Sequence, residues 1–328
     1  MTGLNSSVAK AGNTRLGRLI LGLWMLVVLI WPTSAISDVV VVLSDDSSSY
    51  QEVVAGLKSA WTQSAFPAPV LKVVPLHEVV IHPEMLTGKG VEAIIVVGVR
   101  AAQDIVGIDV HRPVLVTLIP KSSFDKLLQQ YKKRSPEISA IYLDQPLDRQ
   151  VALFRIALPA HKRLGVLIGP DSQDKLNPLQ MAVGNQKIQL VTEKIDSADE
   201  LLPALQRVLS DSDALLAIPD QLVFTKNNVQ SILLTSYRYQ DPVIGYSQAY
   251  VKAGALYAVY STAMQIGQQA GELIQHLLVS KSGTLPVPQY PKYFSVSVNA
   301  QVARSLGIQM EDEAVLVDKL KRTMEQEQ

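Results

Sequence analysis

Runs of apolar, mostly β-branched residues recur along the chain at the length of single strands. The first is 38–43, in which every position from Val39 onward is apolar, as a strand covered on both faces requires. Similar runs follow at 70–74, 93–97, 113–118 and 138–143. Apolar residues at helical spacing lie between several of them, such as Val53, Leu57 and Trp61. This alternation predicts an α/β fold with a mainly parallel, doubly wound sheet.

The same rhythm starts again after the segment 142–146. It predicts helices at about 147–158, 172–184, 199–210, 223–239 and 261–280, and strands at 163–168, 188–191, 214–218 and 242–245. Two tandem units of similar size predict two doubly wound lobes with a cleft between them. One large α/β domain is the alternative.

The proline-rich segment 283–291 cannot continue a helix and predicts a linker that crosses between the lobes. An alternating strand at 293–298, a short helix at 300–306 and a charged terminal helix follow it. We therefore assign 38–143 and about 284–328 to lobe 1, and 144–283 to lobe 2. The crossings between lobes are expected near Asp144, Pro242 and Pro286–Pro291.

Residues 1–37 have the order of a secretory signal peptide. Lys10, Arg15 and Arg18 precede an apolar run at 19–31, and small residues up to Ala35 follow that run. The apolar run is shorter than the ~20 residues that span a bilayer. We expect cleavage near Ala35 and export to the periplasm, with an uncleaved N-terminal anchor as the alternative.

Cysteine content and charge narrow the classes of function. The chain has no cysteine, so disulfides contribute nothing to its stability and no lipid can be attached through a cysteine. It carries 30 Lys and Arg against 30 Asp and Glu, and the leader holds three of these cations and no acid. The mature protein is therefore slightly acidic, a balance that gives no electrostatic footprint for nucleic acid or anionic lipid.

Several stretches carry a resemblance to a known family. The most specific runs from Pro242 to Glu272 and contains V-K-A-G-A-L at 251–256 and I-G-Q-Q-A-G at 266–271. Further agreement lies at 98–102, 158–167 and 298–307. Over nearly its whole mature length the chain resembles the type I periplasmic solute-binding proteins, and among them the ABC-transporter substrate-binding family. The resemblance implies two lobes that close on a solute, and relatives that bind aromatic or other amino acids.

Two departures from the family pattern concern the solute. Val99 stands where the family often has a Thr, which removes a hydroxyl that could hold a ligand carboxylate. Arg100 follows and could supply a bidentate clamp instead. The chain has only five Phe and three Trp, so we do not infer an aromatic solute from the relatives. The class of solute stays open.

Ligands of open α/β sheets bind outside the carboxyl ends of the strands, where loops lead into helix N-termini. A carboxylate could bind at the helix start of Ser48, and an amine at Asp46 or Asp220, although each of these residues could equally cap a helix. Tyr50 and Tyr246 are candidates for stacking on a ligand, with interface packing as the alternative. The candidate ligand-binding residues are Ser44, Asp46, Ser48, Ser49, Tyr50, Gly98, Val99, Arg100, Asp171, Asp220, Tyr246, Ser247 and Gln248.

The stretch 245–249 approximates the G-x-S-x-G signature of hydrolases. His276 is the only histidine after Ser247, and the only carboxylate between them is Glu272, one turn from His276 on the same predicted helix. No catalytic site is therefore expected.

The residues His77, Glu78, His82 and Glu84 have metal-binding side chains, but this spacing on a short strand and loop does not converge on one ion. No GxxxxGK[ST] phosphate loop is present, which excludes the transport ATPase itself. We expect no metal and no cofactor.

The leading hypothesis is a monomeric periplasmic binding protein that captures a small-molecule solute by hinge closure and delivers it to an inner-membrane ABC permease. The solute would be amino-acid-like or carry a carboxylate. The alternative is a periplasmic sensory or accessory protein of the same fold that signals to a membrane receptor or cyclase.

Overall fold

The computed structural model describes residues 38–108, 110–130, 137–280 and 284–326. The predicted leader, with its cleavage near Ala35, lies outside the described residues. Among those described, no helix combines the length and the apolar character needed to cross a membrane.

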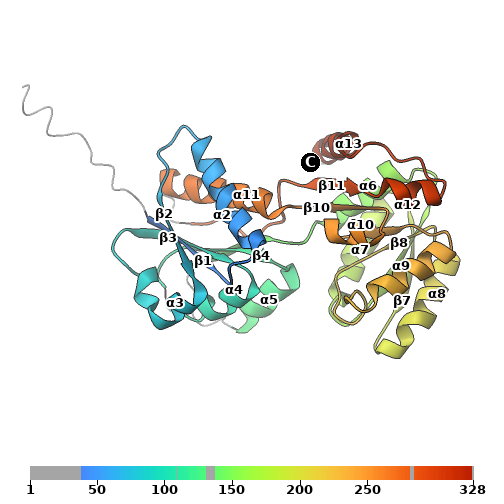
Figure 1. The fold of residues 1–328 in the computed structure, drawn as a ribbon, viewed down its shortest axis with the longest axis horizontal. Coiled ribbons are helices and arrows are strands. Elements are labelled where there is room, and N and C mark those ends of the chain that lie inside the picture. The colour runs from blue at the N-terminus through green and yellow to red at the C-terminus, as the bar shows by residue number, and fades with distance from the viewer. Residues whose placement is uncertain (1–37, 109, 131–136, 281–283, 327–328) are drawn as a thin grey trace, which may run out of the picture. The chain divides into compact units, whose positions relative to one another are not determined.

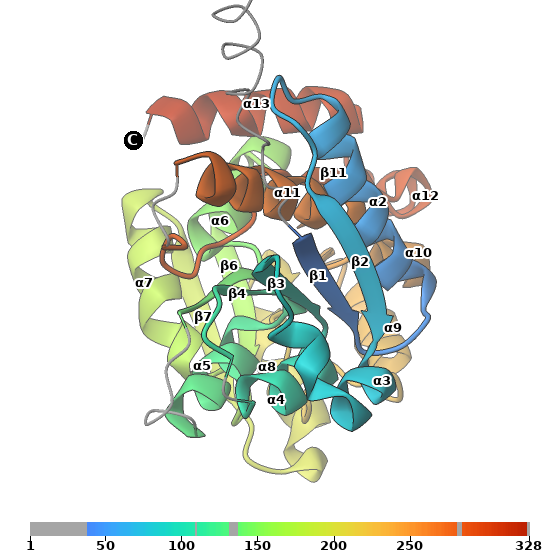
Figure 2. The same ribbon diagram turned by 90° about the vertical axis from the view of Figure 1, so that its left-hand side faces the viewer.

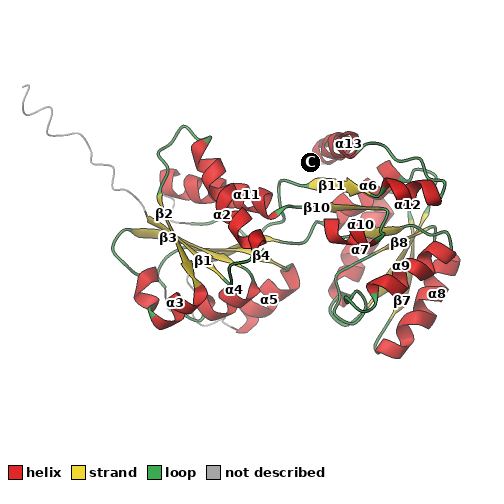
Figure 3. Cartoon of the chain, in the orientation of Figure 1, coloured by secondary structure: helices red, strands yellow, loops and turns green. Residues whose placement is uncertain are grey.

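The first sheet contains β1 (Asp38–Leu43), β2 (Val70–Pro75), β3 (Val91–Val97), β4 (Val114–Ile119) and β5 (Ile138–Tyr142). All pair in parallel in the order β2-β1-β3-β4-β5. Alternate side chains of β1 enter different cores. Val40 and Val42 pack toward α3 (Leu76–Ile81), α4 (Val99–Val106) and α5 (Lys121–Gln130), whereas Val39 and Val41 pack toward α2 (Ser48–Thr62). The sheet is therefore covered on both faces, as its apolar runs predict (Figure 3).

Helix α11 (Ala263–Ser280) packs against α2 on the first sheet, although the sequence placed it in lobe 2 (Figures 1 and 2). Small residues allow the close approach. A Cβ on Gly267 would lie 2.2 Å from the carbonyl oxygen of Val53. The indole Nε1 of Trp61 donates to the carbonyl of Gly271 at 2.9 Å and fixes the register of the pair. The assignment of 261–280 to lobe 2 is wrong, because this apolar face has its partner on the first sheet.

The second sheet contains β6 (Arg163–Ile168), β7 (Gln189–Lys194), β8 (Ala214–Leu216), β9 (Val243–Gly245), β10 (Tyr257–Tyr260) and β11 (Ser295–Val298). Its order is β11-β10-β9-β8-β6-β7, so its five parallel strands repeat the winding of the first sheet. Helices α6 (Leu147–Ala157), α7 (Leu176–Asn185), α8 (Leu201–Asp211), α9 (Val229–Arg238) and α10 (Gln248–Ala253) accompany it, and short 3-10 turns precede α7 and α8. The predicted α/β class with mainly parallel, doubly wound sheets is confirmed.

The prediction that residues 284–328 belong to lobe 1 is wrong for most of this segment. Strand β11 pairs antiparallel with β10 and extends the second sheet. Helices α12 (Ala300–Ser305) and α13 (Glu313–Gln326) follow, and the buried Leu316 and Leu320 of α13 join the core beneath α6. An alternating strand shows that one of its faces is buried but does not show which sheet it joins.

Of the described residues after α11, only the segment 284–290 stays with the first sheet. The backbone N–H of Gln289 donates to the carbonyl of Ala140 at 2.9 Å, and the N–H of Tyr142 donates to the carbonyl of Gln289 at 2.9 Å. This piece of chain therefore covers the edge of β5.

The chain passes between the two sheets at three places within one compact unit. These crossing segments are 143–146 between β5 and α6, 261–262 between β10 and α11, and 291–294 before β11. The first contains Asp144, where a crossing was expected, whereas the third begins only at the last residue of the expected segment Pro286–Pro291, because the residues before Pro291 still bond β5. The expected crossing at Pro242 is wrong, because this residue leads directly into β9 of the same sheet.

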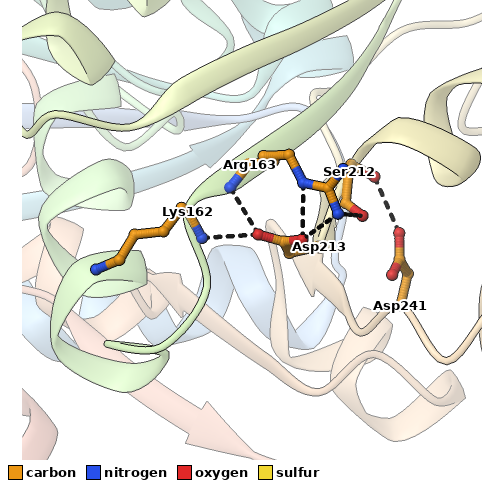
Figure 4. Close-up of polar contacts among 5 residues, drawn as sticks. All are labelled: Lys162, Arg163, Ser212, Asp213 and Asp241. Atoms are coloured by element: carbon orange, nitrogen blue, oxygen red, sulfur yellow. Dashed lines mark hydrogen bonds and ion pairs between the residues drawn. The ribbon is translucent and has the colours of Figure 1, made fainter.

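An ion pair holds the amino edge of the second sheet (Figure 4). The carboxylate of Asp213 accepts hydrogen bonds from the backbone N–H groups of Lys162 and Arg163 at 2.8 and 2.9 Å, and from the guanidinium of Arg163 at 2.9 and 2.6 Å. Beside it, the Ser212 hydroxyl donates to the buried carboxylate of Asp241 at 2.9 Å. These bonds tie the start of β6 to the loops that precede β8 and β9.

Candidate functional site

The loops after β1 and β3 meet where the strand order of the first sheet reverses. The hydroxyl of Ser44 donates to the carbonyl of Val97 at 2.8 Å and accepts from the backbone N–H of Ala101 at 2.9 Å. Gly98 has a φ of 94°, and a Cβ there would lie 2.6 Å from the Tyr50 hydroxyl and 2.7 Å from the Ser44 hydroxyl. Ser44 therefore uses its hydroxyl to join the two loops, and Gly98 makes room for it.

A hollow of about 560 Å³ lies beside these loops and is lined in part by Ser44, Asp46 and Arg100. We call it the Arg100 hollow. The side chain of Arg100 is exposed on the first turn of α4, next to the half-buried Val99. Two exposed apolar residues of α3, Val80 and Ile81, also line it.

The other predicted residues of this loop cluster lie close by. Ser48 and Ser49 are exposed on the first turn of α2, and Tyr50 is half-buried. Ser47 is the N-cap residue of α2, and its side chain accepts no capping hydrogen bond. Ser48 and Ser49 therefore lie at the helix N-terminus from which the sequence predicted carboxylate binding.

The corresponding loops of the second sheet are joined by Asp220. Its side chain is buried, and it accepts from the backbone N–H of Asp171 at 3.0 Å, from the Ser172 hydroxyl at 2.8 Å and from the N–H of Leu222 at 2.9 Å. A Cβ on Gly169 would lie 2.5 Å from this carboxylate. The carboxylate of Asp220 thus holds two loops of its own sheet together. It bonds the turn at Leu222 rather than capping a helix, because the next helix, α9, begins only at Val229, so the expected cap of a helix near Val223 is wrong. Its binding of an amine stays a prediction.

Asp171 also faces the first sheet's side of the molecule. Its carboxylate lies 3.2 Å from the ammonium of Lys126 on α5. The Lys126 side chain is 67% exposed, so this ion pair contributes little stability.

A second pocket, of about 240 Å³, lies at the crossing segments. We call it the crossing pocket. Apolar side chains from both sheets line it, namely Leu143 after β5, Leu147 of α6, Ile218 after β8 and Val259 of β10. Three tyrosines add aromatic surface, Tyr246, Tyr260 and Tyr290. Of the predicted candidates, the structure places Tyr246 and Ser247 here, while Gln248 is exposed on the first turn of α10.

Two side chains of opposite charge line the crossing pocket. One oxygen of Asp144 accepts from the backbone N–H of Lys121 at 2.6 Å and so caps the start of α5. The ammonium of Lys175 lies 3.3 Å from the carboxylate of Asp174, and the Lys175 side chain is only 14% exposed. The pocket is therefore lined by one acidic and one basic residue, and the ammonium of Lys175 already has the Asp174 carboxylate as a partner.

Polar groups without charge complete the pocket. The hydroxyl of Ser247 accepts from the backbone N–H of Tyr250 at 3.3 Å as the N-cap of α10. Burial raises the pKa of the Tyr246 phenol, whose ring lies 4.7 Å from the ring of Tyr250. At neutral pH, Tyr246 therefore offers an uncharged aromatic ring to the pocket.

The sequence did not single out most residues of the crossing pocket. Tyr260 and Asp144 lie at or just past the carboxyl ends of β10 and β5, so the carboxyl-end rule applies to them as well. Asp144 was recognised only as a crossing, and β10 was not predicted as a strand. For Lys175 and Tyr290 no local signal exists, because their place depends on how the crossing segments fold back.

Ser247 and His276 line different hollows, Ser247 the crossing pocket and His276 a surface groove between α2 and α11. The described residues contain no group of three or more His, Cys, Asp or Glu side chains that could hold a metal ion. Of the four residues with metal-binding side chains named from the sequence, His82 and Glu84 lie 3.1 Å apart, measured from Nδ1 to the carboxylate oxygen.

Comparison with known proteins identifies the family. A family model described as "ABC transporter substrate binding protein" matches residues 76–322. The chain belongs to this ABC transporter substrate-binding family. The resemblance inferred from the segment 242–272 is thereby confirmed.

One curated relative of this substrate-binding protein is the "Tyrosine-binding protein" of Clostridioides difficile (strain R20291), which is 21% identical over 201 residues. The match covers 60% of the present chain and spans 57% of the relative's length.

Solved structures share the fold of this substrate-binding protein. A ligand-free, open substrate-binding protein with adhesive properties from Clostridium difficile superposes with a TM-score of 0.69 at 16% identity, covering 84% of this chain and 96% of the other. An ABC domain from Streptococcus pneumonia in complex with L-Trp gives 0.55 at 16% identity, with coverages of 86% and 98%. These matches establish the type I periplasmic-binding-protein fold.

Proposed function

We propose that this protein is the periplasmic substrate-binding component of an ABC-type uptake system and that its solute binds in the crossing pocket. The observation that carries the proposal is the pocket itself, which takes its walls from the carboxyl ends of both sheets and from the crossing segments. A solute held there contacts both sheets at once. It can therefore favour one relative arrangement of the sheets by its differential contacts.

The lining indicates the chemical class of the solute. Lys175 and Asp144 are proposed to attract the carboxylate and the amine of a solute, because opposite charges attract strongly where water is partly excluded. The ammonium of Lys175 would then be shared between the solute and Asp174. The tyrosines and apolar residues suit a hydrocarbon or aromatic group. The pocket, at about 240 Å³, is smaller than the ~300–1,000 Å³ typical of ligand sites. A single amino acid with an apolar or aromatic side chain fits these features.

The relatives support the same class. The curated relative is named for tyrosine, and the pneumococcal structure contains L-Trp. Both are proteins of low identity to this chain, so the solute of this protein rests on its own lining residues.

Hinge closure is the proposed working motion. We assign β1 to β5, α11 and the segment 284–290 to lobe 1, and α6 to β10 together with β11 to α13 to lobe 2. Ser48 and Ser49 lie on the first turn of α2 and Arg100 on the first turn of α4, after the carboxyl ends of β1 and β3. They are proposed to contact the solute or the lobe 2 loops after closure. The protein is proposed to act as a monomer, without cofactor or catalysis, and to deliver its solute to a membrane permease.

A thermal-shift panel tests the proposed solute class. The panel contains L-tyrosine, L-tryptophan, L-leucine, small organic acids, arabinose, ribose and nucleosides, each in large excess. A ligand that binds only the folded state stabilises it by about 2.7 kcal/mol at a hundredfold excess over its Kd, which raises the melting temperature. We expect a rise with at least one apolar or aromatic amino acid and none with its amide and N-acetyl derivatives, because these lack the carboxylate or the ammonium.

Two outcomes contradict the proposal. A rise with a sugar and with no amino acid would assign a different solute class. No rise with any compound would favour the ligand-free sensory role in place of uptake.

A further inference from the structure

Side chains from the crossing segments meet at one point beside the crossing pocket. Gln145 of the first segment donates through Nε2 to the hydroxyl of Ser261 in the second at 2.8 Å. Ser261 in turn donates to the carbonyl of Tyr293 in the third at 2.6 Å. Arg149, on the first turns of α6, donates to the side-chain oxygen of Gln145 at 2.6 Å and to the carbonyl of Pro291 at 2.9 Å. All three crossings are thus bonded to one another.

The direction of each hydrogen bond in this cluster is determined by chemistry. A guanidinium can only donate, so Arg149 requires the Gln145 amide to turn its oxygen toward it. The amide nitrogen of Gln145 then points to Ser261, whose hydroxyl accepts this bond and donates its own hydrogen bond to the Tyr293 carbonyl. Such a chain of bonds loses its order when any member is removed.

Arg149 is an unusual residue to bury at this position. It is 9% exposed, its Nε has no hydrogen-bond partner within the described part of the chain, and its guanidinium carbon lies 4.4 Å from the centre of the Phe294 ring. Burial lowers the pKa of Arg149 to about 10, and no carboxylate of the described residues pairs with it. The group stays charged at neutral pH, so its charge is balanced by carbonyl oxygens and a ring face from different crossings.

The same cluster forms part of the crossing pocket. Gln145 and Ser261 line the pocket, and Gln150, whose amide donates to the carbonyl of Gln145 at 3.3 Å, lines it too. A solute in the pocket would therefore lie directly against two of the residues that bond the crossings together, Gln145 and Ser261.

We propose that Arg149, Gln145 and Ser261 form a hinge clasp, which bonds the three crossings to one another and limits the relative orientations that the two sheets adopt. In this role Arg149 is a positioning residue, since it acts through Gln145 and the Pro291 carbonyl rather than on the solute. The link to solute capture rests on the proposed function, but the clasp itself is testable without any ligand.

The absence of cysteine allows two spin labels to be placed without background. Glu52 on α2 and Gln206 on α8 are both exposed and report on the two sheets. Pulsed electron resonance on the doubly labelled protein, with no ligand added, gives the distribution of distances between the labels. We expect Arg149→Met to broaden this distribution and shift its maximum, and Arg149→Lys to restore part of the original shape through one donated hydrogen bond.

Ser261→Ala provides a second test that removes no charge, and it is expected to broaden the distribution in the same way if Arg149→Met fails to fold. The matched control is Arg155→Met, since Arg155 lies on the same helix and makes no hydrogen bond to the crossing segments among the described residues. A distribution that stays unchanged in Ser261→Ala and in the folded Arg149 variants, with only a lower melting temperature, would overturn the clasp and leave the proposed solute site untouched.

Discussion

The buried carboxylate of Asp241 gives a prediction about stability and pH. It lies at the amino edge of the second sheet, 8% exposed, with the Ser212 hydroxyl donating to it at 2.9 Å (Figure 4). Burial, assisted by the negative charge of Asp213, raises the pKa of Asp241 from 3.8 to about 6, against the opposing effects of Ser212 and Arg163. We predict that Asp241→Asn stabilises the protein above pH 6.

The sign and size follow from proton linkage. Well below pH 3.8, the Asp241 carboxyl is protonated in the folded and unfolded states, so its ionisation costs no folding free energy. As pH rises from 3.8 to about 6, only the unfolded state ionises, and the free energy of unfolding falls. A pKa difference of about 2 corresponds to roughly 3 kcal/mol at about 1.4 kcal/mol for each pKa unit.

Part of this gain is lost on substitution, because an amide accepts the Ser212 hydrogen bond less strongly than a carboxylate. We therefore expect Asp241→Asn to raise the free energy of unfolding by about 1–2 kcal/mol at pH 8 and by much less at pH 4.

Urea unfolding at each pH unit from 4 to 8 measures this difference. The control is Asp318→Asn, at an exposed position of α13, which is expected to change stability by less than ~0.5 kcal/mol at every pH. A gain for Asp241→Asn that is the same at pH 4 and pH 8, or a loss at pH 8, would refute the reasoning.

Two further pairs of substitutions test the packing and the loop bonds by the same unfolding assay. Gly267→Ala should lower the free energy of unfolding by about 1–3 kcal/mol, because the new Cβ would lie 2.2 Å from the Val53 carbonyl oxygen. Gly184→Ala has no neighbour within 4 Å of the new atom and should raise the free energy of unfolding by about 0.5–1 kcal/mol. Asp220→Asn should lower the free energy of unfolding by about 1–3 kcal/mol by leaving buried donors unpaired. The exposed control Asp196→Asn should lower it by less than ~0.5 kcal/mol. Equal effects of the two substitutions within either pair would contradict the contacts described.

The fold class could be predicted because its signal is local. Strand β1 is covered on both faces, so each of its residues from Val39 onward is apolar, and this shows in the sequence without knowledge of any partner. Strand β10 was missed because it has only four residues and lies between helical patterns. The partner of β11 was misassigned because its alternation is satisfied equally by the edge of either sheet.

The candidate site was predictable to the level of loops but not of side-chain direction. The carboxyl-end rule led to Tyr246 and Ser247, which do line the crossing pocket. The same rule led to Asp220, whose oxygens accept hydrogen bonds from Asp171, Ser172 and Leu222 of its own sheet. Whether a polar side chain at a strand end faces a neighbouring loop or a solute depends on the surrounding backbone, which sequence patterns do not specify.

Calorimetric titration of the amino acid that gives the largest rise in the thermal panel tests the proposed site most directly. The wild type is compared with Lys175→Met and with Lys252→Met, a lysine exposed on α10 and outside the crossing pocket. Loss of one partner of a buried charge pair costs about 2–5 kcal/mol, so we expect the affinity of Lys175→Met to fall at least about tenfold. Lys252→Met should bind as the wild type does. Unchanged affinity in Lys175→Met would contradict the assignment of the crossing pocket as the solute site.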